Sequence, residues 1–281
     1  MAVWLKTMAA LREPGAAGAG DEERTPALLR LEGLRKHFGS VRAVDGVDLA
    51  VRERELTAVI GPNGAGKTTL FHLVTGAQRP DGGRVHFAGR DITGWPPAAI
   101  VRAGLARTFQ ITSVFPELTA LENVLLPCLA RDGDTARFWS GWVRHRSRRT
   151  ALEILDRVGL ADQADRPCGQ LSHADQKLVE VAMALATGPR LLLLDEPAAG
   201  LAPGETERVM GALREQAAAG SVTVVLIEHD MDLVFAIADR VVVLHQGRIL
   251  ADGPPEAIRG NPAVKEVYLG GTFAGTAAGR P

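Results

Sequence analysis

Short apolar runs alternate with glycine-rich and charged segments along this chain, and several runs have the length of a buried strand. Residues 56–60 are apolar and β-branched, residues 191–194 are a leucine run followed by two acids, and residues 222–227 form a third run of this kind. Uninterrupted apolar runs of four to eight residues are typical of strands in a parallel sheet that is covered on both faces. The pattern therefore predicts an α/β core.

Shorter alternating segments surround this core. Residues 28–51 alternate between apolar and polar positions, and residues 84–89 form another strand-like segment, which together predict an antiparallel β part. Two further apolar segments, 241–244 and 248–250, predict a hairpin around Gln246–Gly247. From residue 255 onward the spacing becomes helical.

Residues 111–165 change to helical spacing, with Leu118, Leu121 and Val124 on one face, and are predicted to form a helical subdomain. An insert at 131–150 is rich in aromatic and arginine residues, namely Phe138, Trp139, Trp142, Arg144, Arg146, Arg148 and Arg149. Two interpretations of the insert are open. It is either an amphipathic piece that lies against membrane subunits or lipid headgroups, or a solvated arginine-rich helix whose tryptophans face the core.

The two ends are expected to lie outside the folded domain. Residues 12–26 are rich in Gly, Ala, Pro and charge, so 1–27 is predicted to be a disordered leader. A helix over 3–11 that docks on a partner is the alternative. Residues 271–281 are predicted to be a flexible tail.

Composition agrees with a soluble enzyme. A chain of 281 residues can bury a sizeable core, and its net charge of −1 provides no field that would favour nucleic acid. Cys128 and Cys168 lie far apart without metal-like spacing, which indicates two inert thiols in a reducing cytosol.

No apolar run reaches the roughly 18 residues of a membrane span. The longest candidate, 179–194, is interrupted by Glu180 and by Gly-Pro-Arg at 188–190. The first residues also lack the organisation of a signal peptide. Any association with a membrane is therefore expected to come through partners.

The candidate chemistry begins with a phosphate-binding loop. Residues 61–68 read Gly-Pro-Asn-Gly-Ala-Gly-Lys-Thr and match G-x-x-x-x-G-K-[ST] without a mismatch, between a strand-like and a helical segment. Glycines let the backbone curl around phosphate oxygens, Lys67 supplies charge to the β- and γ-phosphates, and the Thr68 hydroxyl can ligate Mg²⁺. The expected nucleotide contacts are Gly61, Pro62, Asn63, Gly64, Ala65, Gly66, Lys67, Thr68 and Thr69.

Two more candidate elements follow the ends of apolar runs. Because ligands of open α/β sheets lie beyond the carboxyl ends of strands, Asp195 is expected to reach Mg²⁺ and Glu196 to activate the attacking water as general base. His229 is expected to hydrogen-bond the γ-phosphate or to hold the water and Glu196 in line. The competing interpretations are a solvated turn before Pro197 and a structural histidine.

The order of these elements resembles an ABC nucleotide-binding domain: phosphate loop, Gln110, signature, Asp195–Glu196 and His229. Residues 171–176, Leu-Ser-His-Ala-Asp-Gln, resemble the ABC signature, which opens a helix whose N–H groups and positive dipole end face the γ-phosphate of a nucleotide held by a second subunit. The resemblance covers about residues 28–270. It implies an α/β, ABC-type P-loop NTPase with a RecA-like core sheet, an antiparallel β subdomain and the helical subdomain.

The resemblance also implies roles for single residues. Phe38 is expected to stack on adenine, with a core-packed phenylalanine at a turn as the alternative. Gln110 is expected to bind Mg²⁺ and water and to link them to membrane subunits. Ser172 and Ala174 are expected to face the partner's γ-phosphate. Ala174 stands where the family has glycine, which permits close approach to phosphate, so we expect an asymmetric pair with one weakened ATP site.

Several strings resemble more specifically the ATPase subunits of branched-chain amino acid importers and of related amide and urea importers; they lie at 104–110, 115–124, 195–201, 228–234 and 264–270. This resemblance implies ATP hydrolysis with Mg²⁺ by a homo- or heterodimer at the cytoplasmic face of the cell membrane. The implied partners are integral membrane permease subunits and, indirectly, an extracytoplasmic solute-binding protein, without nucleic acid. The solute itself is not fixed by the sequence.

Two rival functions remain. A soluble ABC ATPase acting on nucleic acid or ribosomes would need a second cassette or long coiled-coil arms, whereas this chain has one phosphate loop and no sustained heptads. The other rival is a hydrolysis-impaired cassette that binds ATP and pairs with an active paralogue.

Overall fold

The computed structural model describes residues 27–108, 114–131 and 141–273. Residues 1–26 of the predicted leader at 1–27, Gln110, the insert residues Phe138 and Trp139, and residues 274–281 of the predicted tail lie outside the described residues. The side chains of Trp142 and Arg144 also lie outside them.

The larger sheet has six strands among the described residues, in the order β10-β9-β3-β8-β7-β6. Their bounds are β3 Leu56–Ile60, β6 Leu105–Arg107, β7 Leu191–Asp195, β8 Thr223–Ile227, β9 Arg240–His245 and β10 Arg248–Gly253. Strands β9, β3, β8, β7 and β6 are parallel, and β10 pairs antiparallel with β9. The predicted parallel core and the C-terminal hairpin are therefore confirmed.

Every residue of β3, β7 and β8 is buried, because both faces of this sheet are covered. Leu192 and Leu194 of β7 belong to the core cluster on the side of the helical layer, whereas Leu191 and Leu193 belong to the cluster shared with the second sheet. Burial on both faces explains why these strands are uninterrupted apolar runs in the sequence.

The second sheet is antiparallel, in the order β2-β1-β4-β5 for the strands described. It consists of β1 Leu29–Phe38, β2 Val41–Val51, β4 Gly82–Phe87 and β5 Arg90–Asp91. The strand predicted at 84–89 ends earlier, at Phe87. Ala88 and Gly89 have φ of 50° and 76° and form the turn into β5, a conformation that an extended strand cannot contain.

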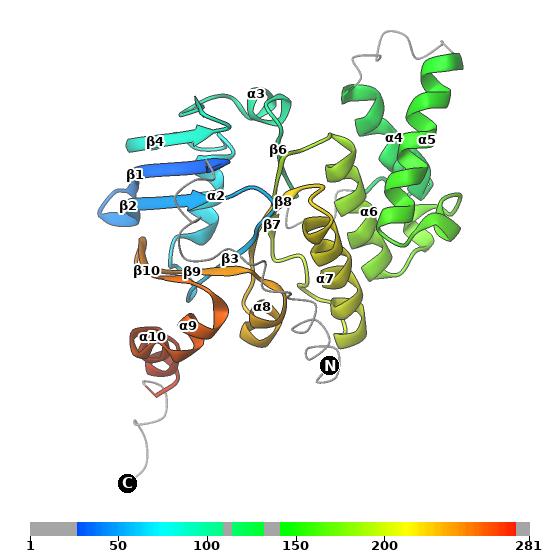
Figure 1. Ribbon diagram of the computed structural model, residues 1–281. Coiled ribbons are helices and arrows are strands. Elements are labelled where there is room, and N and C mark those ends of the chain that lie inside the picture. The colour runs from blue at the N-terminus through cyan, green and yellow to red at the C-terminus, as the bar shows by residue number, and fades with distance from the viewer. Residues whose placement is uncertain (1–26, 109–113, 132–140, 274–281) are drawn as a thin grey trace.

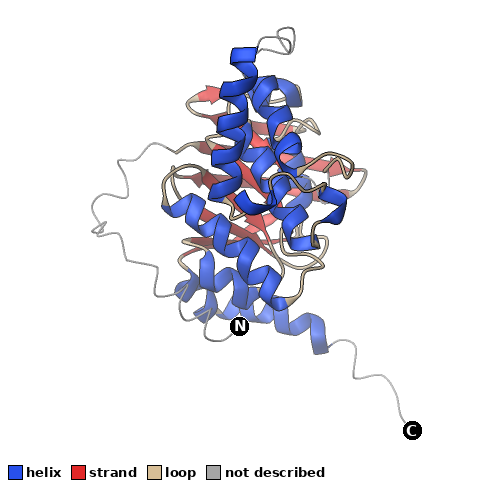
Figure 2. Ribbon diagram, turned by 90° about the vertical axis from the view of Figure 1, so that its right-hand side faces the viewer, coloured by secondary structure: helices blue, strands red, loops and turns tan. Residues whose placement is uncertain are grey.

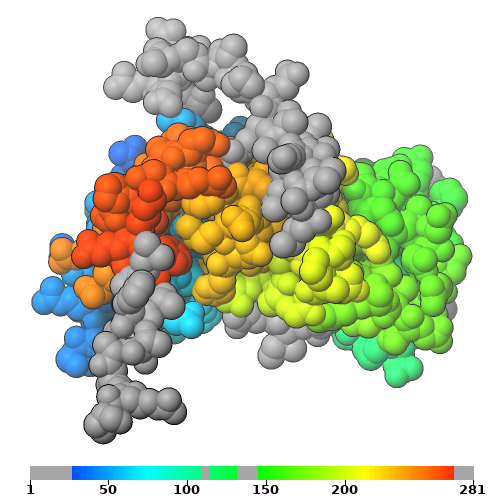
Figure 3. Space-filling model, turned by 90° about the horizontal axis from the view of Figure 1, so that it is seen from below, coloured from blue at the N-terminus to red at the C-terminus, as the bar shows by residue number. Residues whose placement is uncertain are grey.

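The α-helices are α2 Lys67–Val74, α3 Pro97–Arg102, α4 Ala120–Arg131, α5 Gly141–Arg157, α6 His173–Ala186, α7 Pro203–Ala218, α8 Met231–Ile237, α9 Pro255–Gly260 and α10 Pro262–Phe273. Helices α4, α5 and α6 stand together at one end of the molecule, opposite the antiparallel sheet (Figure 1). Figure 2 looks onto these helices and shows them in front of the strands. From below, the helical end and the C-terminal α9–α10 lie at opposite ends (Figure 3).

Two predicted boundaries can be compared with the helices. Beyond the predicted helical subdomain at 111–165, α6 packs against both α4 and α5. At the other boundary α10 continues to Phe273, so residues 271–273 of the predicted tail are helical. The glycines at 270 and 271 lower helix propensity, but no proline follows them within the helix to stop it.

The structure shows how exposed the arginines of the insert and the two cysteines are. Arg146, Arg148 and Arg149 are exposed on α5, which both interpretations of the insert require. Cys128 and Cys168 are buried, and burial raises the pKa of the Cys168 thiol to about 11, consistent with inert thiols. No helix within the described ranges combines the length and the apolarity needed to cross a membrane.

Candidate nucleotide and catalytic site

The phosphate loop connects β3 to α2 and is pressed against two neighbouring strands. Gly61 has φ of 153°, and a Cβ atom there would lie 2.1 Å from the Leu244 carbonyl oxygen of β9. Gly66 has φ of 103°, and a Cβ atom there would lie 2.0 Å from the Ala43 carbonyl oxygen of β2. Only glycine fits these two positions, so the tight path of the loop follows from the motif.

The C-terminal part of the chain supports the loop from behind. The Gly247 N–H in the β9–β10 turn donates to the Ala65 carbonyl at 2.9 Å, and the Asp45 N–H donates to the Gly247 carbonyl at 2.8 Å. The Gly61 backbone also hydrogen-bonds to the hydroxyl of Tyr268 on α10; burial nevertheless raises the pKa of Tyr268 to about 12. The loop is thus fixed by the hairpin and by α10 together.

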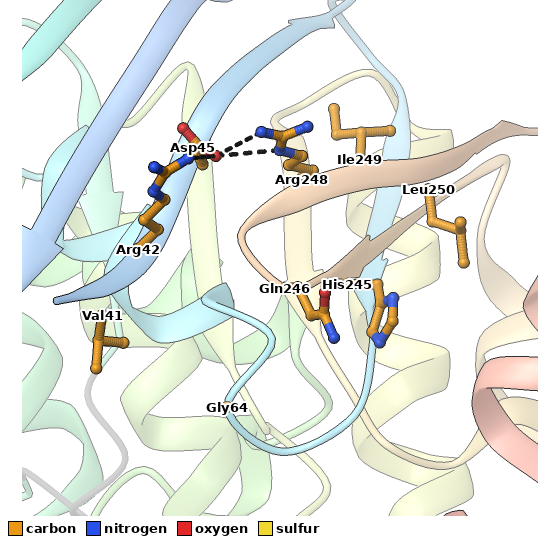
Figure 4. Close-up of a pocket in the computed structure, with 9 residues that line it drawn as sticks. All are labelled: Val41, Arg42, Asp45, Gly64, His245, Gln246, Arg248, Ile249 and Leu250. Carbon is orange, nitrogen blue, oxygen red and sulfur yellow. Dashed lines mark hydrogen bonds and ion pairs between the residues drawn. The ribbon is translucent and has the colours of Figure 1, made fainter. Parts of the chain in front are cut away.

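A cavity of about 630 Å³ lies between β2, the phosphate loop and the β9–β10 turn. Its lining residues are Val41, Arg42, Asp45, Gly64, His245, Gln246, Arg248, Ile249 and Leu250. Arg42 and Arg248 converge on Asp45 (Figure 4), and the hydrogen bond from Arg248 is the main cause that lowers the pKa of Asp45. The surface beside the loop therefore combines apolar side chains with a cluster of two arginines and one aspartate.

Phe38 lies at the end of β1 and its side chain is on the surface. The residue is 46% exposed, and the Lys36 ammonium lies 5.6 Å from the centroid of its ring. The alternative of a phenylalanine packed into the core is therefore wrong. An exposed aromatic face is what stacking on a base requires.

Lys67 is the first residue of α2 and is almost fully buried. Its ammonium donates to the carbonyls of Gly61 at 2.7 Å and Pro62 at 3.0 Å. Burial lowers the pKa of Lys67, while Glu196 and Asp195 act in the opposite direction. Gly66 provides no side-chain cap for α2, so the first N–H groups of this helix are available to an anion.

Asp195 and Glu196 come directly at and after the end of β7, as predicted. The Arg107 guanidinium donates to Asp195 Oδ2 at 2.8 Å, and both side chains are buried. Asp195 Oδ1 is also buried and has no hydrogen-bond partner among the described residues. A buried carboxylate oxygen without a partner is costly, which marks this atom as a position for a ligand.

His229 follows β8 and meets Glu196. The His229 Nε2 atom lies 2.7 Å from Glu196 Oε1. Since β8 pairs with β7, with Asp195 opposite Ile227, the two strand ends bring these side chains together. Glu196 itself has φ of 52°, an unfavourable backbone conformation for a residue other than glycine. Residues 196–199 do form a turn after β7, as the competing interpretation requires, but the Glu196 carboxylate contacts His229 within it.

Glu228, which precedes His229, is a further residue of this site that no sequence motif identified. It is 5% exposed and accepts hydrogen bonds from the N–H groups of Ala198 and His229, at 2.9 and 3.3 Å. Burial is the main cause that raises the pKa of Glu228. A charged residue directly after an apolar strand and before a candidate site residue was the available signal.

The signature segment forms the start of α6. Ser172 is the N-cap: its hydroxyl oxygen accepts from the Asp175 N–H at 3.1 Å, and its O–H donates to Asp175 Oδ2 at 2.8 Å. Asp175 also pairs with Arg208 of α7. Ala174 is fully buried and belongs to the core, so its extra methyl does not lie on the exposed start of the helix. The weakening of one ATP site by Ala174 stays a prediction.

A parallel sheet covered on both faces, with a phosphate loop, two acids and a histidine at its edge, defines a P-loop nucleotide hydrolase. The ABC transporter family model matches residues 44–199, and the model of the branched-chain amino acid ATP-binding cassette transporter matches residues 248–274.

Known relatives agree with these matches. The chain is 44% identical to the high-affinity branched-chain amino acid transport ATP-binding protein BraF of Pseudomonas aeruginosa and 42% identical to LivG of Escherichia coli K12; each alignment covers 86% of this chain and 98% of the relative. A nucleotide-free ATP-binding cassette from an ABC transporter has a TM-score of 0.75 at 36% identity, covering 86% of this chain and 98% of that structure. The ADP conformation of an ABC transporter cassette has a TM-score of 0.78, also at 36% identity, covering 88% and 100%. The chain belongs to the ABC transporter family, in the group of branched-chain amino acid transport ATP-binding proteins, and it is an ATP-hydrolysing cassette.

Proposed function

We propose that this chain is the ATPase subunit of an importer for branched-chain amino acids, or for related small amides or urea. ATP-driven closure of a dimer, with this chain as one or both subunits, would drive the membrane permease subunits at the cytoplasmic face of the membrane. The likeness of residues 248–274 to the branched-chain amino acid model carries this proposal. Residues 248–273 contain β10, α9 and α10, so the likeness extends beyond the motifs shared by ABC ATPases.

The residues at the sheet edge fit an ATP molecule. Phe38 offers its exposed ring to adenine, and the nucleotide-facing part of the loop comprises Gly61, Pro62, Asn63, Gly64, Ala65, Gly66, Lys67, Thr68 and Thr69. The start of α2 adds backbone N–H groups and the positive end of the helix dipole. The buried Lys67 ammonium leaves two loop carbonyls to bind phosphate oxygens.

The same edge fits Mg²⁺. Asp195 Oδ1 is buried without a hydrogen-bond partner in the described parts of the chain, and a carboxylate oxygen is a preferred Mg²⁺ ligand. Thr68, whose hydroxyl the motif assigns to the metal, is exposed at the start of α2, and Gln110 completes the proposed set. When bound, Mg²⁺ neutralises charge on the β- and γ-phosphates.

Glu196 is the proposed general base and His229 its companion. The contact of 2.7 Å between His229 Nε2 and Glu196 Oε1 orients the carboxylate, which accepts the proton of the attacking water. His229 is exposed, so its ring can also contact the γ-phosphate. The contact between these two side chains supports hydrolysis at this phosphate loop over the rival of a hydrolysis-impaired cassette.

A second cavity, of about 230 Å³, supports the coupling to permease subunits. It lies between the end of β6 and the helical layer, lined by Arg107, Thr108, Pro127, Glu180, Met183, Ala184 and Thr187. Thr108 immediately precedes the segment that contains Gln110. An apolar hollow shared by two structural layers is a suitable docking site for a short permease helix.

Reconstitution tests this proposal. The chain, its genetically neighbouring permease subunits and their solute-binding protein are assembled in proteoliposomes, and uptake of leucine, valine, urea and a small amide is measured with ATP inside. We expect saturable, ATP-dependent leucine and valine uptake that the Glu196→Gln variant lacks. Failure to assemble with the permease, together with ATP hydrolysis stimulated by DNA or ribosomes, would support the nucleic-acid alternative instead.

A further inference from the structure

The backbone of Glu196 adopts a conformation that needs external support. Its φ of 52° lies in the left-handed region, and Glu196 has no property that favours this region. Such conformations persist only where surrounding contacts over-determine them. The position of the Glu196 carboxylate therefore depends on whatever holds the turn from Glu196 to Ala199.

Three hydrogen bonds hold this turn, and two of them come from the end of β8. The Glu196 N–H donates to the Ile227 carbonyl at 3.0 Å, and the Ala199 N–H donates to the Glu196 carbonyl at 3.0 Å. The Ala198 N–H donates to Glu228 Oε1 at 2.9 Å. Within the turn, the bond to Glu228 is the one that depends on a side chain.

Three consecutive residues thus act on Glu196 from the same strand end. Ile227 binds its N–H, Glu228 binds the turn two residues later, and His229 contacts its carboxylate at 2.7 Å. Glu228 also ties its own strand end together, because its Oε2 atom accepts from the His229 N–H at 3.3 Å. A change at Glu228 would reach both partners of the Glu196–His229 contact.

The burial of Glu228 is costly and needs an explanation. The residue is 5% exposed, and both carboxylate oxygens accept from backbone N–H groups. Burial raises the pKa of Glu228, the two N–H groups lower it, and the nearby charge of Glu196 raises it further. An acid placed beside another acid in a buried position is unfavourable for stability alone.

We propose that Glu228 is a positioning residue for ATP hydrolysis: its carboxylate clamps the 196–199 turn and so keeps the Glu196 carboxylate against His229. This inference rests on the proposed role of Glu196 as general base. Glu228 itself touches neither nucleotide nor water in this scheme; it acts through the backbone of Ala198. Displacing a catalytic group by about 1 Å can lower a rate by about 100-fold, so loss of the clamp should have a large effect on the rate of ATP hydrolysis.

Three substitutions in the full chain, assayed in the assembled transporter, test the clamp. Glu228→Gln keeps an Oε1 acceptor for the Ala198 N–H and gives up only the longer bond from the His229 N–H, whereas Glu228→Ala removes both acceptors and Glu228→Met removes both while filling the space. We expect kcat for ATP to fall by about 30-fold or more in the Ala and Met variants, with KM and nucleotide affinity within about twofold of wild type. The Gln variant should restore kcat to within about threefold of wild type.

Asp48→Ala is the matched control. Asp48 of β2 accepts a backbone N–H bond from Gly33 at 2.7 Å on the exposed side of the antiparallel sheet, far along the chain from the catalytic residues. It should leave kcat unchanged, so the control isolates the effect of losing a backbone-to-carboxylate bond at this one turn.

The possible outcomes separate this inference from the role of Glu196. If Glu196→Gln abolishes hydrolysis but both Glu228→Ala and Glu228→Met keep normal kcat, the clamp is refuted and the general base stands. If Glu196→Gln hydrolyses ATP normally, the base assignment fails first. If nucleotide affinity falls together with kcat, or if the Gln variant is as slow as the Ala variant, Glu228 is a structural or chemical residue and the positioning role is overturned.

Discussion

Two helices of this chain begin in opposite ways, although both are assigned to phosphate. Helix α2 starts at Lys67 without a side-chain cap and without an acid in its first turn. Helix α6 starts with Ser172 as its cap and carries Asp175 in its first turn. An open helix start attracts anions, whereas an acid in the first turn already satisfies the helix dipole.

The two halves of an ABC site therefore differ here in how far their polar groups are already paired within the chain. On the phosphate-loop side, the start of α2 has no side-chain cap, and Asp195 Oδ1 is buried without a hydrogen-bond partner among the described residues. On the signature side the polar groups are already paired, because the Asp175 carboxylate accepts a hydrogen bond from the Ser172 O–H and forms an ion pair with Arg208. We therefore propose that Asp175, beside Ala174, also weakens the interaction of the signature side with phosphate.

Among the substitutions on the phosphate-loop side, Glu196→Gln should have the largest effect on ATP hydrolysis. Removing the general base should lower turnover by about 100-fold or more while ATP still binds. Steady-state hydrolysis and an equilibrium nucleotide-binding assay on the same preparation measure the two effects. Near-normal hydrolysis by the purified variant would sink the assignment of Glu196.

Asp195→Asn should have the next largest effect, and it should appear even without nucleotide. The substitution leaves the buried Arg107 guanidinium without its carboxylate, which costs about 3 kcal/mol of unfolding free energy. It also weakens the Mg²⁺ dependence of ATP binding. Chemical denaturation without Mg²⁺ and Mg²⁺ titration of ATP binding measure these effects; an unchanged denaturation midpoint would mean that the Arg107–Asp195 pair contributes no net stability.

Much of the phosphate-loop side could be predicted from the sequence, because its parts are local. The limits of β3 and the position of Asp195 follow from apolar runs that are buried on both faces. The support given by Glu228 and Tyr268 could not be predicted in this way. These residues act on backbone groups that are distant in sequence, and no local period encodes such contacts.

The signature side shows the same limit. The sequence identifies Ser172 and Ala174 by motif, but the fate of each depends on neighbours that the motif does not specify. Ala174 packs into the core formed with other helices, and Asp175 meets Arg208 of α7. A motif predicts the start of a helix reliably, while the direction and partners of each side chain require the fold.

Asp175→Gln tests the signature side and should sharpen the comparison. Removing the acid from the first turn of α6 should strengthen its interaction with the partner's γ-phosphate by about 1 kcal/mol, or about fivefold in ATPase rate of the assembled transporter at limiting ATP. Ala174→Gly is the contrasting variant. It should lose about 1 kcal/mol of stability through helix propensity and leave the rate unchanged. A rate increase in Ala174→Gly but not in Asp175→Gln would show that the methyl group of Ala174, and not the charge of Asp175, weakens the signature side.

The smallest expected effect concerns the support of the phosphate loop by α10. Tyr268→Phe removes the hydroxyl that hydrogen-bonds to the Gly61 backbone and leaves the ring in place. Loss of one such bond is worth about 0.5–1.5 kcal/mol, so ATP affinity should fall about threefold with kcat at saturating ATP unchanged. Lys265→Ala, an exposed position on the same helix, is the control and should bind ATP like wild type. Equal ATP affinity in Tyr268→Phe and wild type would show that the loop keeps its conformation without α10, and that the glycines at 61 and 66 and the β9–β10 turn are sufficient to prepare this side of the site.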